Sequence, residues 1–281
     1  MFRLSDAELL AYVAEDVPTF DLTTALQGAP GITVSVELIA KEDCVVALSE
    51  EAARIVQLHE CRVEHLMASS SHAKEGDVIV RFSGSYATAH KIYRSMQVLM
   101  EYGSKIATTT HDMLQKIRAI NPKCGLYTTR KTYPLAKRFG IRGVLAGGGL
   151  PHRLGLSESV LFFEQHRILY PNTQSFYNEI EHFKKTACEK KVVVESHDFD
   201  DALALLEAGV DVLQLDKLTP ETIDKIVQHK ELHYSHAKIL AAGGINLQNV
   251  AEFAATQVDG IVTSAPYLGG MCSISTKMRP L

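Results

Sequence analysis

The sequence predicts an α/β protein with two parts, a mixed N-terminal domain and a C-terminal open barrel of about seven parallel strands. In the first third of the chain, predicted strands and helices follow no fixed order. From residue 124 onward, short β-prone runs alternate with amphipathic stretches. Charged residues and glycines follow these runs directly, which indicates an active site at one rim of the barrel.

The first third combines both kinds of secondary structure. The spacing of apolar residues predicts helices over 5–15 and 50–58. Runs rich in β-branched residues predict strands at 32–39 and 77–82. The segment 87–120 is low in Gly and Pro and has helical spacing throughout, so we expect one or two helices there. This mixture is typical of an α+β domain.

Repeated strand-helix units follow in the remainder of the chain. The expected strands are 124–128, 143–146, 160–163, 192–194, 211–215, 238–242 and 260–263. The expected helices between the later strands are 200–207, 220–228 and 247–255. Such units form parallel sheets, and about seven of them predict a barrel or an open barrel. We place the N-terminal domain at 1–110, the barrel at 111–268, and at 269–281 a tail that returns to the first domain.

Composition excludes several classes of function. The formal charge is -4, with 29 Lys and Arg against 33 Asp and Glu, so we expect neither a nucleic-acid partner nor an anionic membrane surface. No apolar stretch approaches the roughly 20 residues of a membrane span. The first residues turn acidic where a signal peptide stays apolar. The five cysteines are scattered without a C-x-x-C pair, which argues against disulfides and structural zinc and favours the cytoplasm.

The candidate site residues follow the predicted strands. In chain order they are Arg130 and Lys131, His152 and Arg153, Glu195, Asp216, Gly243 and Gly244, and Ser264. The basic residues suit an anionic substrate, because arginine binds planar anions through two parallel hydrogen bonds. Ion pairing on the surface is the alternative explanation for this basic group.

The carboxylates and the glycine pair suggest a sugar phosphate. Glu195 and Asp216 could hold Mg²⁺ or sugar hydroxyls, or they could be solvated rim residues. Gly243 and Gly244 could offer backbone N–H groups to a phosphate, or could form only a tight turn. Together these features indicate a phosphorylated sugar that meets an anionic acceptor. They do not separate transfer of the sugar from isomerisation or aldol chemistry.

Several motifs then point to one family. They are E-D at 15–16, D-L-T at 21–23, S-K-I-A-T at 104–108, T-R-K-T at 129–132, G-G-G at 147–149, H-R-L-G-L at 152–156, V-E at 194–195, L-D at 215–216 and A-G-G-I at 242–245. In this order and spacing the chain resembles quinolinate phosphoribosyltransferase, also called nicotinate-nucleotide pyrophosphorylase. The resemblance covers nearly the whole chain.

The resemblance implies an enzyme that joins quinolinate to phosphoribosyl pyrophosphate, releases pyrophosphate and carbon dioxide, and forms nicotinate mononucleotide. It also implies an N-terminal α/β sandwich, an open barrel, and a homodimer in which Arg94 reaches the partner's site. The residues expected to bind the acid are Arg130, His152 and Arg153. Those expected to act in catalysis are Lys131, on the acid or the pyrophosphate, and Glu195 and Asp216, on the ribose and Mg²⁺. Those expected to hold the 5′-phosphate are Gly243, Gly244 and Ser264.

The chain departs from the family pattern at three single positions and in one motif, where the family's G-A-L-T-H is S-A-P-Y-L at 264–268. Phe163 replaces a lysine of the acid pocket, Lys217 an asparagine, and Ala242 a serine. These differences resemble the ModD branch, which is associated with molybdate-transport operons. We therefore expect a phosphoribosyltransferase for another aromatic acid. The alternatives are quinolinate itself, with Lys217 or Lys105 compensating, and a non-catalytic oxyanion-binding protein for molybdate handling.

Overall fold

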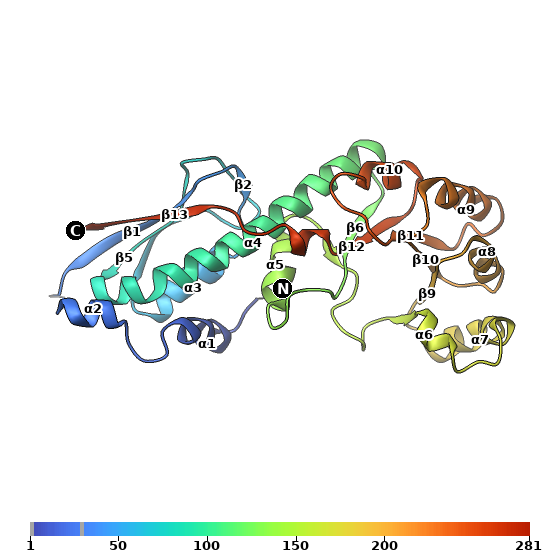
Figure 1. Cartoon of the computed structure of the whole chain (residues 1–281), viewed down its shortest axis with the longest axis horizontal. Helices are drawn as coiled ribbons and strands as arrows, with labels where there is room; N and C mark the ends of the chain where they lie inside the picture. The colour runs from blue at the N-terminus through green and yellow to red at the C-terminus, as the bar shows by residue number, and fades with distance from the viewer. Residues whose placement is uncertain (1–2, 29–30) are drawn as a thin grey trace. The chain divides into compact units, whose positions relative to one another are not determined.

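The computed structural model describes residues 3–28 and 31–281, and the chain divides into two compact units (Figure 1). Unit 1 comprises Met1–His111, Thr132–Gly148 and Pro266–Leu281. Unit 2 comprises Asp112–Lys131 and Gly149–Ala265. The boundaries expected from the sequence differ mainly at Thr132–Gly148, which belongs to unit 1 although we had placed it in the barrel. No helix within the described ranges combines the length and the apolar character that a membrane span requires.

Unit 1 is built on a four-stranded antiparallel sheet with the order β13-β1-β5-β3. Its strands are β1 Thr33–Ala40, β3 Arg62–Leu66, β5 Val78–Ser85 and β13 Ile274–Pro280. A two-stranded sheet joins β2 Cys44–Val45 to β4 His72–Ala73. In Figure 1 the last strand, in red, runs beside β1, in blue. The C-terminal tail is therefore part of the unit 1 sheet.

Three of the helices that begin in unit 1 lie close to the ranges 5–15, 50–58 and 87–120 expected from the sequence, and two others were not expected. α1 Asp6–Asp16 begins at Ser5, which forms a capping box with Glu8. The other helices that begin in this unit are α2 Leu22–Gln27, α3 Ser49–Leu58, α4 Tyr86–Ile120 and α5 Lys137–Ala146. The segment for which the sequence left one or two helices open is the single helix α4, which is 35 residues long.

One expected strand is wrong. Residues 143–146 form the end of helix α5, and the glycines there have a packing role. A Cβ atom on Gly143 would lie 2.7 Å from the carbonyl oxygen of Gly103, and one on Gly147 would collide with that of Ala107. Glycine therefore allows α5 to approach α4 closely. In the sequence, the same glycines had suggested a strand followed by a turn.

Unit 2 contains a seven-stranded sheet with the order β7-β6-β12-β11-β10-β9-β8, in which every neighbouring pair is parallel. The strands are β6 Gly125–Thr128, β7 Leu150–Pro151, β8 Val160–Phe162, β9 Val192–Ser196, β10 Val212–Asp216, β11 Lys238–Ala242 and β12 Gly260–Thr263. The expected open barrel of about seven strands is confirmed. Its second strand is the short β7, and the barrel is open between β7 and β8.

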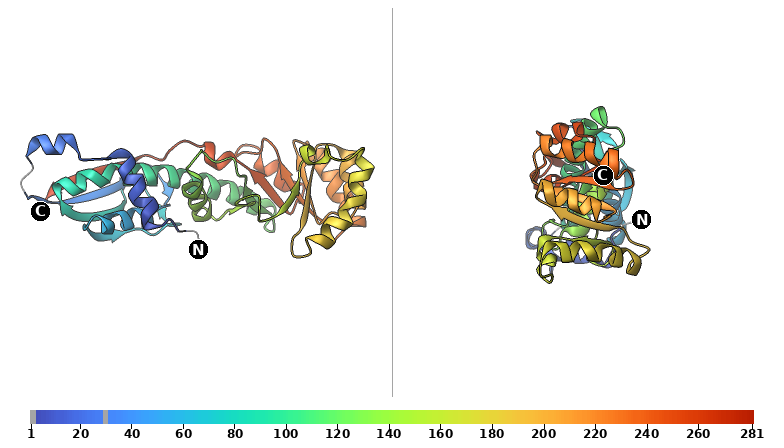
Figure 2. Two further views of the ribbon diagram at one scale, coloured as in Figure 1. Left: turned by 90° about the horizontal axis from the view of Figure 1, so that it is seen from below. Right: turned by 90° about the vertical axis from the view of Figure 1, so that its right-hand side faces the viewer.

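The two faces of this sheet have different partners. In Figure 2 the helices of unit 2, in yellow and orange, lie along one face of this sheet. Side chains such as Val194 and Leu215 belong to the large core on that face. The helices of unit 2 are α6 Glu164–Arg167, α7 Thr173–Thr186, α8 Phe199–Glu207, α9 Pro220–His233 and α10 Val250–Ala255, and the 3-10 helix η1 Ala265–Leu268 follows β12. Inward-facing Val193 and Val212 belong to a smaller cluster with Leu240. Side chains alternate along a strand, so Glu195 and Asp216 also face inward, beyond this cluster.

Candidate functional site

The carboxyl ends of the parallel strands gather most of the predicted site residues in unit 2. Those residues are Arg130 and Lys131 after β6, His152 and Arg153 after β7, Phe163 after β8, Glu195 in β9, Asp216 in β10, Gly243 and Gly244 after β11, and Ser264 after β12. All seven strands point in the same direction, so these residues lie at one end of the sheet. Arg94 belongs to α4 in unit 1 and is described separately below.

A compact acidic group lies at the ends of β9 and β10. Glu195 and Asp216 flank His197, whose Nε2 lies 3.3 Å from Glu195 Oε1 and whose Nδ1 lies 3.4 Å from Asp216 Oδ2. Burial raises the pKa of Glu195, and the nearby charge of Asp216 raises it further. Gln214 opposes this shift by donating its Nε2–H to Glu195 Oε2 at 2.6 Å. The site therefore holds two like charges close together in a partly buried place.

Sequence reasoning missed His197 and Gln214. His197 follows Glu195 by two residues, directly past the end of β9, so its position at the rim was a usable signal. Gln214 is a polar residue inside an otherwise apolar strand and faces the same side as Asp216, two residues later. Both signals follow from strand alternation once the strand limits are known.

The donor set formed by Glu195, His197 and Asp216 fits a divalent cation. One ligand atom from each residue can be chosen so that all three lie within 4.8 Å of one another. Carboxylate oxygens are suitable ligands for Mg²⁺, and an imidazole nitrogen is suitable for several transition ions. A bound cation would also relieve the repulsion between the two carboxylates.

The basic side of the rim is built around Arg153. This arginine is only 8% exposed, and among the described residues no carboxylate forms an ion pair with it. Its guanidinium carbon lies 5.5 Å from the centre of the Phe163 ring. Burial lowers the pKa of Arg153, and the charge of Arg130 adds to this effect. A buried guanidinium without a protein anion is a place for an anionic ligand.

His152 and Phe163 complete this part of the rim. Burial lowers the pKa of His152, and the neighbouring charge of Arg153 lowers it further, so the imidazole is neutral at neutral pH. Phe163 packs with the inner apolar cluster of the barrel and stacks on His166 at a centroid distance of 5.8 Å. The rim therefore presents a cation, a neutral imidazole and an aromatic face together.

The turn after β11 brings the backbone close to the acidic group. Gly243 and Gly244 have φ values of +88° and +71°. A Cβ atom on Gly243 would lie 2.5 Å from the backbone nitrogen of Lys217 and 2.8 Å from Asp216 Oδ1. Glycine is therefore required at 243 both by the backbone conformation and by the space available. Nearby, Ser264 Oγ lies 2.5 Å from the hydroxyl oxygen of Thr129.

Behind Glu195, a polar network fixes the main chain of β9. Arg167, in α6, donates from Nη2 to the carbonyl oxygen of Glu195 at 2.5 Å and pairs through Nη1 with Asp201 Oδ1 at 2.7 Å. Asp201 also accepts hydrogen bonds from Tyr177 and Ser196. The Arg167 side chain is 16% exposed, which favours strong charge-assisted bonds. This network ties α6, α7 and α8 to the strand end that carries Glu195.

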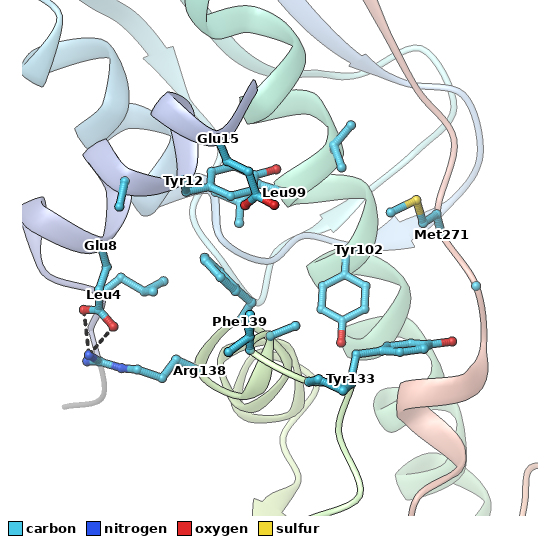
Figure 3. Close-up of a pocket in the computed structure, with 16 residues that line it drawn as sticks. Leu4, Glu8, Tyr12, Glu15, Leu99, Tyr102, Tyr133, Arg138, Phe139 and Met271 are labelled. Carbon is cyan, nitrogen blue, oxygen red and sulfur yellow. Dashed lines mark hydrogen bonds and ion pairs between the residues drawn. The ribbon is translucent and has the colours of Figure 1, made fainter. Parts of the chain in front are cut away.

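Unit 1 contributes two separate features. Arg94 is exposed on α4, donates to Gln97 Oε1 at 3.2 Å, and forms no ion pair with a described carboxylate. Unit 1 also holds a largely apolar cavity of about 700 Å³ (Figure 3). Tyr102 and Phe139 line it, and Arg138 pairs with Glu8 at its edge. None of the predicted site residues lines this cavity.

The strand-end arrangement in unit 2 is that of an α/β-barrel enzyme with a rim suited to phosphate, a cation and an anionic substrate. The comparison with protein families then identifies which one. The C-terminal domain of quinolinate phosphoribosyl transferase matches residues 106–269, and the N-terminal domain of the same family matches residues 21–104. The chain belongs to this family.

Individual relatives agree with this assignment. A protein of Rhodobacter capsulatus named as a ModD pyrophosphorylase is 34% identical over 89% of this chain and 96% of its own. A protein of Methanothermobacter thermautotrophicus named as a carboxylating nicotinate-nucleotide pyrophosphorylase is 29% identical over 91% of this chain and 93% of its own. The protein is accordingly a phosphoribosyltransferase of the pyrophosphorylase type, within the glycosyltransferase class of enzymes.

Solved structures share the fold. NadC from Streptococcus pyogenes superposes with a TM-score of 0.89 at 23% identity and covers 99% of both chains. The nicotinate-nucleotide pyrophosphorylase from Francisella tularensis gives a TM-score of 0.85 at 21% identity, over 98% of this chain and 95% of that one.

Proposed function

We propose that this phosphoribosyltransferase transfers the phosphoribosyl group to the ring nitrogen of an aromatic acid whose ring edge facing Phe163 carries no charge. The observation that supports this proposal is the pairing of Arg153 with Phe163. Arg153 is buried and forms no ion pair with a described carboxylate, so its guanidinium can pair with the carboxylate of a bound acid. Phe163 lies beside it and offers only an aromatic face.

One carboxylate of the acceptor would pair with this basic group. Arg153 and Arg130 supply the charge, and the neutral His152 can exchange a hydrogen bond with a ring or carboxylate atom. A second carboxylate at Phe163 would lose its water without gaining a cation. Since an unpaired buried charge is unfavourable, a dicarboxylate such as quinolinate should bind less well than a matched monocarboxylate.

The donor substrate would occupy the opposite side of the rim. The 5′-phosphate would bind the backbone N–H groups of Gly243 and Gly244 together with Ser264, because a loop of successive amides forms a nest for anions. Glu195 and Asp216 would contact the ribose hydroxyls and hold Mg²⁺, which supplies positive charge to the pyrophosphate oxygens when it is bound. Lys131 would pair with the same pyrophosphate.

The reaction needs no enzyme nucleophile. The lone pair of the acceptor nitrogen forms the new bond to the anomeric carbon while the bond from that carbon to the pyrophosphate oxygen breaks. Pyrophosphate leaves with the bonding electrons, and positive charge develops on the ribose ring. Glu195 and Asp216 lie where they could stabilise this charge, and Lys131 could neutralise the leaving group.

Quinolinate itself is the second candidate, with loss of carbon dioxide after transfer. It is favoured by the position of Lys217, whose backbone lies beside Gly243 with a φ of +60°. A lysine at position 217 is close enough to the acidic group to belong to the rim. It could therefore supply the positive charge that the family's lysine would have supplied at position 163. Lys105, the other candidate for this compensation, belongs to unit 1.

We further propose that the enzyme is a homodimer in which Arg94 completes the site of the partner subunit. Arg94 is exposed and has no acidic partner among the described side chains, as expected for a residue that binds elsewhere. Around the cavity in unit 1, Leu135 and Met271 are strongly exposed, which is typical of an interface. We place the protein in the cytoplasm and, because its sequence resembles the ModD branch, among the proteins associated with molybdate transport.

Pyrophosphate release from phosphoribosyl pyrophosphate tests this proposal. The assay compares pyridine monocarboxylates with quinolinate and with no acceptor, at fixed Mg²⁺, and mass spectrometry identifies the nucleotide product. We expect a monocarboxylate to be turned over without release of carbon dioxide. Faster turnover of quinolinate, with carbon dioxide released, would support the second candidate. Absence of turnover with every aromatic acid would contradict both.

A further inference from the structure

We propose that Glu195, His197 and Asp216 together bind a first-row transition ion such as Zn²⁺ or Co²⁺, and that His197 makes the substrate-free site prefer this ion to Mg²⁺. The inference deepens the proposed function, because it concerns the same strand ends. The sequence motifs predict Mg²⁺ on Glu195 and Asp216 and do not include His197. The present proposal adds the imidazole of His197 as a third ligand.

The geometry of the three side chains supports a shared ion. Their ligand atoms lie within 4.8 Å of one another. Ligand atoms about 2.1 Å from one ion lie about 3 to 4.2 Å apart, so only a small adjustment closes the site. The adjustment is available at His197, whose side chain is 42% exposed and whose Nδ1 contacts the main-chain oxygen and the carboxylate of Asp216 at 3.2 and 3.4 Å. The carboxylates, at 12% and 18% exposure, are held by their strands.

Gln214 gives an independent indication of a ligand. Its Nε2–H is donated to Glu195 Oε2 at 2.6 Å, which fixes that carboxylate. Its Oε1 is buried and has no hydrogen-bond partner in the described part of the chain, while the whole residue is 5% exposed. A buried amide oxygen rarely stays without a donor. A water molecule bound to an ion at Glu195 would supply one.

The chemistry of the donors decides which ion binds. Mg²⁺ prefers six oxygen ligands in an octahedron and keeps several of its waters. Imidazole nitrogen favours Zn²⁺, Fe²⁺, Ni²⁺ and Cu²⁺, and the affinity of nitrogen and oxygen sites rises along the first-row series toward copper. One imidazole and two carboxylates leave positions open for substrate oxygens or water. A transition ion can therefore occupy the free enzyme, whereas Mg²⁺ can enter with phosphoribosyl pyrophosphate.

Cobalt is a suitable probe because its visible absorption reports its ligands. The full-length protein, stripped of metal with a chelator, would be titrated with Co²⁺ by absorption and calorimetry, with and without a hundredfold excess of Mg²⁺ and without substrate. We expect one Co²⁺ per chain, retained in the presence of Mg²⁺. His197→Asn should weaken Co²⁺ binding about ten- to a hundredfold and change Mg²⁺ binding by less than about twofold.

A pair of histidines outside the proposed site provides the control. His229 and His233 lie one turn apart on α9, with ring centroids 4.7 Å apart, and could compete for a transition ion. His233→Asn should leave Co²⁺ binding unchanged. The proposal is overturned if Co²⁺ fails to bind, if Mg²⁺ displaces it equally well, or if His233→Asn abolishes binding while His197→Asn does not. Since no substrate is present, a failure of the acceptor assay leaves this result standing, and the reverse is also true.

Discussion

The guanidinium of Arg153 lies 5.5 Å from the centre of the Phe163 ring, so a buried cation and an aromatic face share one edge of the barrel rim. A cation over an aromatic ring is itself favourable, which keeps Arg153 in place when no anion is bound. The family pattern has a lysine at position 163. The replacement therefore exchanges a second positive charge for an aromatic wall, and we expect it to change which acids fit.

Phe163→Lys should shift the preference of the enzyme toward quinolinate. The added ammonium would pair with the second carboxylate, and we expect quinolinate to bind about ten- to a hundredfold more tightly. Competition binding of quinolinate against a monocarboxylate measures the change. Phe163→Leu is the matched control, since it removes the ring without adding charge. Turnover of quinolinate by the unaltered enzyme at or above about 10⁴ M⁻¹s⁻¹ would contradict the prediction.

Glu195→Gln should abolish most activity without loss of stability. The pKa of Glu195 is raised in the folded protein, so at neutral pH its ionisation opposes folding. The neutral amide removes this cost and can still accept the bond from Gln214. We expect kcat to fall about a hundredfold or more while the free energy of unfolding at pH 7 stays equal or rises. Asp216→Asn should likewise lose activity.

Urea denaturation at pH 7 and steady-state kinetics on the same preparations show whether Glu195 acts in catalysis or only in the structure of the rim. Glu207→Gln, at the exposed end of α8, serves as the control. A clear loss of stability in Glu195→Gln with normal turnover would mean that the carboxylate is a structural rim residue.

Arg167→Met should lower kcat although Arg167 does not line the substrate rim. The arginine fixes the main-chain oxygen of Glu195 from behind, so its loss lets the carboxylate drift. A misplacement of about 1 Å can reduce the rate about a hundredfold. We expect kcat to fall about ten- to a hundredfold with KM nearly unchanged. Tyr177→Phe removes only the hydrogen bond from Tyr177 to Asp201, so it should lower kcat less. If both variants lose the same amount of kcat and the same amount of thermal stability, the network has a purely structural role.

Mixed dimers test the shared site. Arg94→Ala and Glu195→Ala subunits should each be inactive as homodimers. When the two are mixed and allowed to exchange, heterodimers contain one intact site, so activity should return to about a quarter of that of the unaltered enzyme. Native mass spectrometry would verify exchange. Persistent inactivity despite proven heterodimers would contradict the role of Arg94 across an interface.

His152 should make stability depend on pH. Its folded pKa is lowered below the ordinary value of 6.5 by burial, so the unfolded ring binds a proton first as the pH falls. The contribution of the neutral His152 ring to the free energy of unfolding is therefore complete above about pH 6.5 and declines below it, by about 1.4 kcal/mol for each unit of pKa shift. His152→Gln should decline less between pH 7.5 and 5.5 in denaturant titrations. His236→Gln, at an exposed position, should behave like the unaltered protein.

Much of the architecture could be predicted from the sequence because local patterns act within each element. The alternation in β1, the capping residue Ser5 before α1, and the apolar spacing of α4 each specify an element without help from the rest of the chain. The strand-helix repeats likewise specify a parallel sheet, and parallel strands bring Glu195 and Asp216 to the same end. The candidate site was therefore visible as a set of residues that follow strands.

The remaining features depended on contacts between segments that are distant in the sequence. Gly143 and Gly147 pack against α4, and no local pattern separates a helix with packing glycines from a strand with a turn. Leu150–Pro151 is too short to produce a signal of its own and becomes a strand only by pairing with β6. Three further features likewise require the folded chain. They are the hydrogen bond from Gln214 to Glu195, the hydrogen bond from Arg167 to the main chain of Glu195, and the burial of Arg153 beside Phe163. The sequence by itself determined which residues reach the rim, and the tertiary structure decided which of them are buried, paired or left for a ligand, because burial and charge pairing are properties of neighbours in space.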